Sequence, residues 1–372
     1  MSAVAYLDHN ATSPLRPAAF DAMVDALRAG GNPSSVHRQG RIARSRVDTA
    51  RRQVAGLMDV LPSEVVFTSG GTEANSLVLH GSGRRRVLVS AVEHDSVRRV
   101  VPEAEIIPVD ADGVVKVSEL ERMLAKSREP ALVSVMFANN ETGVLQPIAD
   151  VVRIARAAGA LVHCDAVQGA GKQPVEMHAL GVDYMSVSAH KLGGPTGVGA
   201  LVVRENAPFI TDRIGGAQES NRRAGTENVA GIVGFGAAAV EAKIGLATGA
   251  QRDRLEWGLT HVAPGAQIFG DKVPRLANTT CISMPGVKAE TQVMALDLAG
   301  VAVSAGAACT SGKVTRSNVL SAMGVQDAVA ETAIRISLGW NTVPEDIDRL
   351  IAAWQDLYIR VGHSGIGQAR AA

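Results

Sequence analysis

The chain has 372 residues, 46% of them hydrophobic, and its acidic and basic side chains balance at 37 each. This length favours two domains with a large core, and the balanced charge argues against nucleic acid or an anionic membrane as partner. The first residues lack a signal-peptide pattern, no apolar run approaches the roughly 18 residues of a membrane span, and three scattered cysteines cannot form a disulfide framework. We therefore expect a cytoplasmic protein.

The first two-thirds of the chain predict an α/β domain. Helical patterns cover residues 16–29 and about 37–58, and a third covers residues 148–158. Short apolar segments between residues 60 and 205 are the expected strands: 65–68, 86–90, 104–109, 131–138, 160–164, 184–188 and 199–203. Apolar strands that alternate with helices are typical of a mostly parallel sheet covered on both faces.

Beyond about residue 250 the pattern changes to single helices and strands. We expect strands at 278–284, 301–304 and 333–338, a helix at 291–298, and a last amphipathic helix that begins near Pro344. This pattern predicts a smaller α+β domain. Residues 16–249 are assigned to the large domain, and residues 1–15 and 250–372 to the small one.

One lysine has an unusual sequence environment. In S-V-S-A-H-K-L-G-G, Lys191 follows an apolar strand and opens a glycine-rich loop, whereas the other seven lysines are expected to be exposed. Desolvation lowers the pKa of an amine and makes it nucleophilic, as a Schiff-base lysine requires. The alternative is a lysine that reaches solvent from the edge of the sheet.

Other polar residues follow predicted strands. A-L-V-H-C-D-A-V-Q ends a strand at Asp165, with Gln168 three residues later, and His94 and Asn140 also follow strands. Ligands bind at the carboxyl ends of the strands in open α/β sheets. Pyridoxal 5′-phosphate (PLP) needs a lysine for its aldehyde and an aspartate for its ring nitrogen. Each residue alone could equally be structural.

The segment F-T-S-G-G-T-E-A-N, residues 67–75, predicts a strand, a glycine turn and the start of a helix. Free backbone N–H groups at a helix N-terminus bind anions. The segment lacks a P-loop lysine and the dinucleotide glycine spacing, so it suits a single phosphate.

Two residues in the C-terminal third could take part in chemistry. Cys309 lies among small residues in V-S-A-G-A-A-C-T-S-G-K, so its thiol is a candidate nucleophile, whereas Cys164 and Cys281 lie in apolar runs. Arg335 stands inside the apolar strand A-I-R-I-S-L, where it could bind a substrate carboxylate or form a structural ion pair.

From Y-L-D-H-N-A-T-S-P-L near the start to I-R-I-S-L-G near the end, the chain resembles the cysteine desulfurases. These form the NifS/IscS-like branch of the class V aminotransferases, with PLP fold type I. The resemblance implies an enzyme that converts L-cysteine to L-alanine and keeps the sulfur as a persulfide on Cys309.

The resemblance also implies roles for individual residues. Lys191 would hold PLP covalently and move the substrate Cα proton, Asp165 would pair with the ring nitrogen, and His94 would stack on the ring and move protons. The remaining cofactor contacts would come from Gln168 and Asn140 at the ring hydroxyl, and from Gly71, Thr72, Ser188 and His190 at the phosphate. Thr226 would reach the phosphate of a neighbouring subunit, which implies a homodimer with shared sites. Arg335, assisted by Asn140, would bind the carboxylate of L-cysteine, and no metal is expected.

Several features depart from the family pattern and leave alternatives open. The loop carries Ala305 and Ala307 where relatives usually have serines, and the residues after Cys309 differ from the common version. The tail lacks the extension with which some relatives bind a scaffold protein. The sulfur acceptor is therefore unidentified, an iron–sulfur scaffold being one candidate. The alternatives are a selenocysteine lyase, another PLP lyase or aminotransferase, and a catalytically silent sulfur-relay subunit.

Overall fold

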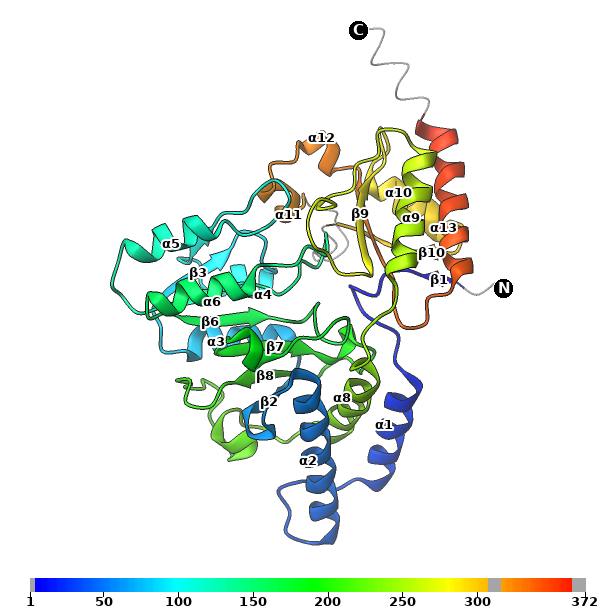
Figure 1. Cartoon of the computed structure of the whole chain (residues 1–372). Helices are drawn as coiled ribbons and strands as arrows, with labels where there is room; N and C mark the ends of the chain where they lie inside the picture. Colours follow the sequence, from blue (N-terminus) through cyan, green and yellow to red (C-terminus); the bar gives the residue numbers. More distant parts are fainter. Residues whose placement is uncertain (1–3, 307–315, 363–372) are drawn as a thin grey trace.

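The structure is a computed structural model that describes residues 4–306 and 316–362, arranged as two lobes (Figure 1). The larger lobe contains a seven-stranded sheet of order β2-β8-β7-β6-β5-β3-β4. Its strands are β2 (Val65–Thr68), β3 (Arg86–Ser90), β4 (Glu105–Ile107), β5 (Ala131–Ser134), β6 (Leu161–Asp165), β7 (Tyr184–Ser188) and β8 (Gly199–Val203). The strand β8 runs antiparallel to its two neighbours, β2 and β7, and the other neighbouring strands pair in parallel, which confirms the prediction of a mostly parallel sheet.

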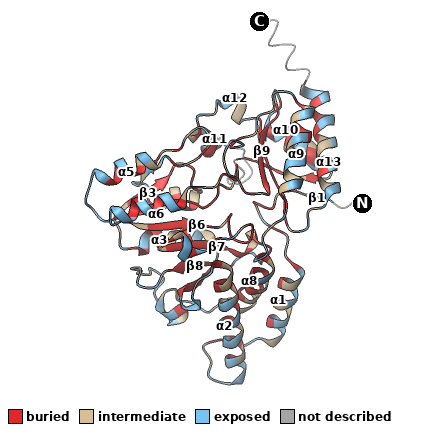
Figure 2. Cartoon of the chain, in the orientation of Figure 1, coloured by how far each residue is buried: buried red, intermediate tan, exposed pale blue. Residues whose placement is uncertain are grey.

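Helices cover both faces of this sheet, which explains why its strands are apolar throughout. Every residue of β2, β5, β7 and β8 is buried, and Figure 2 shows β7 and β8 in the colour of buried residues. One face packs against α3 (Gly71–Gly81) and α4 (Asp95–Arg98). The helices that contribute to the core on the other face are α2 (Arg38–Met58), α5 (Val117–Ala125), α6 (Ile148–Ala157), α7 (Met177–Leu180) and α8 (Val229–Ala242).

Helices α1 (Pro17–Ala29) and α2 pack against α8 at one side of the large lobe (Figure 1). Although α2 is rich in arginine, its buried residues Ala43, Val47, Ala50 and Val54 recur every three or four positions and form one apolar stripe. A Cβ on Gly236 of α8 would lie 2.7 Å from the Cα of Ala50. Glycine at this position therefore lets the two helices approach closely.

The smaller lobe contains an antiparallel sheet of order β11-β12-β9 and a parallel pair of β1 with β10. These strands are β1 (Ala5–Tyr6), β9 (Thr279–Ser283), β10 (Val301–Ala302), β11 (Ser304–Ala305) and β12 (Ala333–Ser337). Around Trp354 they form a core with α9 (Gly249–Val262), α10 (Ala289–Leu298) and α13 (Pro344–Leu357). By contrast, Val319 and Leu320 of α11 (Asn318–Ala322) belong to the core of the large lobe.

The segment after β1 passes from the small lobe to the large one. Asp8 forms a β-bridge with Ser337, the N–H of Ser13 donates to the carbonyl of His190 at 2.7 Å, and that of Arg16 donates to Gly193 at 2.8 Å. The chain between these contacts therefore runs beside the loop after β7. In the part of the chain that the structure describes, no helix combines the length and apolarity needed to cross a membrane.

Candidate active site

A cavity of about 330 Å³ lies beyond the carboxyl ends of the parallel strands. Ten of the residues predicted from the sequence line it: Gly71, Thr72, His94, Asn140, Asp165, Gln168, Ser188, His190, Lys191 and Arg335. Of the other two, Thr226 is exposed and does not line this cavity, and Cys309 lies outside the described residues. The strand-end residues thus meet at one edge of the sheet, as parallel topology requires.

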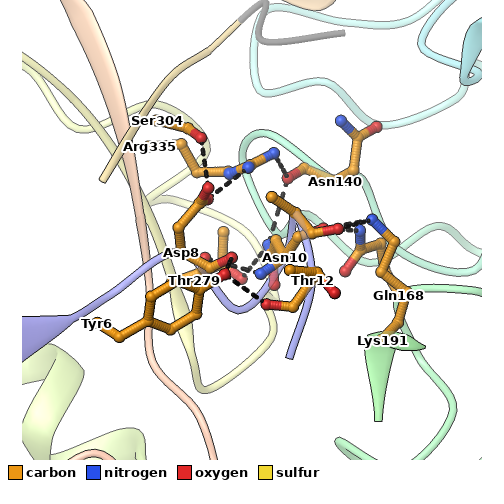
Figure 3. Close-up of polar contacts among 12 residues, drawn as sticks. Tyr6, Asp8, Asn10, Thr12, Asn140, Gln168, Lys191, Thr279, Ser304 and Arg335 are labelled. Atoms are coloured by element: carbon orange, nitrogen blue, oxygen red, sulfur yellow. Dashed lines mark hydrogen bonds and ion pairs between the residues drawn. The ribbon is translucent and has the colours of Figure 1, made fainter. Parts of the chain in front are cut away.

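Lys191 follows β7 in the short helix η2 (Ala189–Lys191). Its Nζ donates to the carbonyl oxygens of Asn10 and Ala11, each at 2.7 Å (Figure 3). These acceptors belong to the N-terminal segment between the lobes, which the sequence did not identify as part of the site. The amine is therefore oriented by main-chain oxygens that no side-chain substitution would remove directly.

Asp165 ends β6 and is buried. Its Oδ1 accepts the N–H of Val167 at 3.0 Å, and its Oδ2 accepts from Nδ2 of Asn75 at 2.8 Å. Asn75 lies on α3 and also donates to Oγ of Ser96 at 2.9 Å. The sequence analysis did not identify this role. The available signal was an asparagine three residues after Thr72, near the start of the predicted helix.

Glu93 is fully buried next to this carboxylate. Its Oε1 accepts the N–H of Met136 at 2.6 Å, while Oε2 has no hydrogen-bond partner. Burial, with the negative charge of Asp165 as a second cause, raises the pKa of Glu93 well above its ordinary value. The surroundings of Glu93 therefore favour its neutral form, which avoids a second negative charge beside Asp165.

His94 occupies the N-cap position of α4. Its Nδ1 accepts the N–H of Ser96 at 3.1 Å and lies 2.8 Å from the Ser96 hydroxyl. Because Nδ1 is an acceptor, the network assigns the ring proton of the neutral imidazole to Nε2. The ring lines the cavity with this tautomer fixed by its own helix.

The N-terminus of α3 forms the floor of the cavity at Gly71 and Thr72. A Cβ on Gly71 would come within 2.8 Å of Val167, and one on Gly199 within 2.8 Å of the Gly70 backbone. Small residues are thus required for the turn to pack against β6 and β8. An eleven-residue helix with free N–H groups at this end suits an anion such as phosphate.

Ser188 and His190 complete this end of the cavity. Ser188 is buried at the end of β7, and Nδ1 of His190 lies 3.2 Å from the hydroxyl of Thr12. Burial, followed by the nearby charge of Lys191, lowers the pKa of His190 to about 4. The ring is therefore neutral at physiological pH and contributes hydrogen-bonding groups, not a positive charge, to this end of the cavity.

Arg335 projects from β12 of the small lobe and is buried. Its Nη2 donates to Oδ1 of Asp8 at 2.7 Å and its Nη1 to the carbonyl of Asn140 at 3.2 Å (Figure 3). Asp8 also accepts from the hydroxyl of Ser304 at 2.7 Å. The guanidinium therefore forms a structural ion pair and also lines the cavity, and its role toward a substrate carboxylate stays a prediction.

Lys172 corrects the expectation that every lysine except Lys191 is exposed. It is 7% exposed, and its Nζ donates at 2.6 Å both to Oδ1 of Asn10 and to Oε1 of Gln168. The tight turn before it explains its burial, since Gly171 has φ 74° and a Cβ there would lie 2.9 Å from Leu192. A lone Gly-Lys pair in the sequence gave no sign of this packing.

Glu141 is a second ionisable residue that the sequence analysis missed. It is buried, and its Oε2 accepts from the hydroxyl of Ser317 at 2.6 Å. Burial raises its pKa to about 7. Its segment, N-N-E-T-G, has the composition of an exposed turn. Ser317, 176 positions later in the chain, helps to bury this turn.

The cavity suits PLP on the chemistry of its side chains. One hollow holds a primary amine at Lys191, a buried carboxylate at Asp165 and a helix N-terminus at Gly71. These match the aldehyde, the ring nitrogen and the phosphate of PLP. Among the residues that the structure describes, no group of His, Cys, Asp or Glu side chains could hold a metal ion.

Known proteins share both the sequence and the fold. The model of the aminotransferase class-V family matches residues 5–350. A cysteine desulfurase of Cereibacter sphaeroides is 44% identical over 93% of this chain and 93% of its own length. An IscS-like cysteine desulfurase of Mycobacterium tuberculosis is 39% identical over 99% and 100%. The NifS-like protein of Rickettsia africae superposes with a TM-score of 0.88 at 35% identity, over 95% of this chain and 99% of its own.

The fold and the cavity together define a PLP-dependent enzyme of fold type I, so the predicted fold class and cofactor are confirmed. The chain belongs to the aminotransferase class-V family, and within that family to the cysteine desulfurases.

Proposed function

We propose that this enzyme converts L-cysteine to L-alanine and transfers the sulfur to Cys309 as a persulfide, for iron–sulfur cluster or other sulfur-requiring biosynthesis. The observation that best supports the proposal is that Lys191, Asp165 and Arg335 line one cavity. These residues supply a nucleophilic amine, a carboxylate for the ring nitrogen and a cation for the substrate carboxylate. The names of the relatives favour this reaction over the alternative lyases and aminotransferases.

When bound, PLP acts as an electron sink for the bonds around the substrate Cα. Lys191 removes the Cα proton, with its Nζ oriented by the carbonyls of Asn10 and Ala11. Asp165 keeps a proton on the ring nitrogen, and its own orientation comes from Asn75. His94 transfers protons through Nε2, since Nδ1 is engaged by Ser96. Arg335, which lines the cavity, binds the carboxylate of L-cysteine through its guanidinium.

Sulfur transfer then requires a thiolate. The Cys309 sulfur attacks the substrate sulfur, a sulfur–sulfur bond forms, and the substrate Cβ–S bond breaks with its electron pair left on carbon. Protonation of that carbon yields L-alanine. The start of the segment that carries Cys309 supports this role, because Ser304 in β11 pairs directly with Arg335 in β12. The chain therefore enters this segment from beside the residue proposed to bind substrate.

The test compares the parent enzyme with Cys309→Ala in the presence of PLP, L-cysteine and a thiol reductant. The parent is expected to be yellow and to release sulfide and alanine, whereas Cys309→Ala should stay yellow and lose sulfide release. Cys281→Ala is a matched control, because Cys281 is a buried thiol whose pKa is raised by burial. Sulfide release by Cys309→Ala at the parental rate contradicts the persulfide step, and a colourless, inactive parent favours a silent relay subunit.

We also propose a cytoplasmic homodimer in which each chain contributes Thr226 to the site of its partner. Thr226 is exposed, and its loop is joined to the phosphate-binding end of α3 by the pair of Arg223 with Glu73, at 2.9 Å. The sulfur acceptor is proposed to be a protein, with an iron–sulfur scaffold as the first candidate to test. The domain boundaries, 16–249 against 1–15 and 250–372, are proposed on the core around Trp354, and Val319 and Leu320 of the small domain pack into the core of the large one.

A further inference from the structure

Lys172 has no role in the chemistry described above, yet it is buried beside the residues that perform it. Its two hydrogen-bond acceptors, Oδ1 of Asn10 and Oε1 of Gln168, are neutral amide oxygens. Within residues 4–306 and 316–362, no carboxylate forms an ion pair with it. A buried ammonium without a counter-charge is costly, so this arrangement needs an explanation.

The surroundings of Lys172 favour an uncharged amine. Burial is the main cause that lowers its pKa well below the ordinary value, and the positive charges of Lys191 and Arg335 lower it further. A neutral amine has two N–H bonds. Both are used by the two amide oxygens, so the observed contacts are complete without an ammonium proton.

These two hydrogen bonds fix the orientation of two amides. Because the Gln168 oxygen faces Lys172, its Nε2 points the other way and donates to the carbonyl of Asn10 at 3.0 Å. The Asn10 amide is oriented likewise, and its Nδ2 donates to Thr279 at 2.9 Å and to the carbonyl of Asn140 at 3.2 Å. Neither amide could be reversed without placing N–H groups against the Lys172 donors.

The Asn10 carbonyl links this network to the reactive amine. It accepts from Gln168 and also from Nζ of Lys191, and Figure 3 shows Asn10 between Lys191 and Arg335. On the other side, the Asn140 carbonyl that accepts from Asn10 also accepts from Arg335. Lys172 and Lys191 further line one small cavity with His9. These hydrogen bonds therefore connect Lys172 both with Lys191 and with Arg335.

We propose that Lys172 is a positioning residue that acts as an uncharged amine, holding the Asn10 carbonyl and the Gln168 amide so that Lys191 stays in its working orientation. The inference rests on the proposed function, because it assigns Lys172 a role relative to Lys191 and the cofactor. Lys172 is not a catalytic residue, since it acts through Asn10 and Gln168.

Two substitutions separate the hydrogen-bonding role from packing and from charge. Lys172→Met has similar length but no donor, whereas Lys172→Gln has no charge but keeps an NH₂ group. Lys243→Met serves as the matched control, because Lys243 is exposed. For Lys172→Met we expect kcat to fall by about 10²-fold with a much smaller change in KM, as for a misoriented reacting group. Lys172→Gln should recover most of this loss.

A second readout does not depend on turnover. In each holoenzyme the pH at which the yellow colour titrates reports the environment of Lys191, and borohydride trapping followed by mass spectrometry reports its reaction with PLP. Lys172→Met should shift the colour midpoint and slow the trapping, while Lys172→Gln and Lys243→Met should resemble the parent. Variants that lose thermal stability but keep the parental midpoint and trapping rate would show a purely structural role and overturn the proposal.

The charge state can be tested in the unaltered enzyme, which covers the case that neither variant folds. With ¹³C-labelled lysine, the Cε chemical shift of Lys172 in the holoenzyme at pH 7 should be that of a neutral amine. An ammonium shift contradicts the proposal. The parent assay separates this outcome from failure of the proposed function, because a parent that is yellow and releases sulfide leaves the function intact even if Lys172 proves irrelevant.

Discussion

At the scale of single residues, Glu141 makes stability depend on pH. Its folded-state pKa is about 7, against an ordinary value of 4.5, so its contribution to folding is complete below pH 4.5 and is lost as the pH rises through 7. We expect the free energy of unfolding to fall by about 3 kcal/mol across this interval from this residue. Glu141→Gln, which resembles the protonated form, should remove that slope in denaturant titrations between pH 4.5 and 8.

The control for this prediction is Glu129→Gln, because Glu129 is exposed and should leave the slope unchanged. A Glu141→Gln variant with the parental pH dependence would show that the carboxyl ionises without cost in the folded chain. The hydroxyl of Ser317, which donates to this carboxyl, would then have to stabilise the ionised form more strongly than burial opposes it.

The residues that sequence reasoning found and missed differ in one physical respect. Lys191 and Asp165 follow apolar strands, so their own neighbours in the chain predict burial at a strand end. Glu141 and Lys172 lie in turns of polar composition, and distant segments bury them: Ser317 lies opposite Glu141, and Asn10 opposite Lys172. A single sequence does not indicate which turns will be covered by distant segments of the chain.

At the scale of secondary structure, element boundaries could be predicted where neighbouring residues determine them, and not where distant contacts do. Strands β2, β3, β7 and β8 begin and end where the apolar runs do. Strand β5 was expected to reach residue 138 but ends at Ser134, although the N–H groups of Val135 and Phe137 still donate to His163 and Asp165 of β6 at 3.1 and 2.8 Å. The carbonyl of Phe137 accepts from Gln146, and the N–H of Asn139 donates to Val144 at 2.9 Å. These turn contacts compete with the sheet and bring Asn140 into the site.

The turn η3 (Gln218–Asn221) yields a prediction at this scale. Glu219, Ser220 and Asn221 have φ values of 48°, 57° and 63°, a run that non-glycine residues rarely adopt. Glu219 holds the turn against β2, since its carboxylate accepts from Arg51 at 2.6 and 2.7 Å and from the N–H of Phe67 at 2.9 Å. Glu219→Gln should therefore lower the free energy of unfolding by about 3–5 kcal/mol, measured by denaturant unfolding.

Asp348→Asn is the matched control, because its ion pair with Arg254 is half exposed and should contribute about 1 kcal/mol or less. If the two variants lose equal stability, the turn is not held by the buried pair. The comparison also bears on the site, since this turn leads directly into the loop that carries Thr226.

At the scale of the whole molecule, the active site depends on contacts between the lobes. Arg335 and Asp8 approach from the small lobe, while Lys191 and Asp165 lie on the large one, and the N-terminal segment contacts both. The resemblance predicted the residues of this arrangement. The local pattern alone did not, because nothing in residues 8–12 marks their carbonyls as partners of Lys191.

The proposed homodimer makes the completeness of each site depend on two chains. A site formed by one chain uses its own Lys191 and the Thr226 of its partner. Lys191→Ala and Thr226→Ala homodimers should therefore each be deficient, the second through a roughly 10–100-fold weaker affinity for PLP, the expected effect of losing a hydrogen bond to a charged group. A heterodimer of the two variants should contain one intact site and one doubly deficient site.

Heterodimers purified through two different affinity tags test this arrangement at limiting PLP. We expect one tight PLP site per dimer and about half of the parental sulfide release. Heterodimers in which both substitutions sit on one chain are the control: there, one site lacks only Lys191 and the other lacks only Thr226, so no intact site remains. Higher activity of the control heterodimer would mean that Thr226 acts within its own chain, and equal activity would mean that Thr226 does not affect the site. Either result would require the shared site to be abandoned.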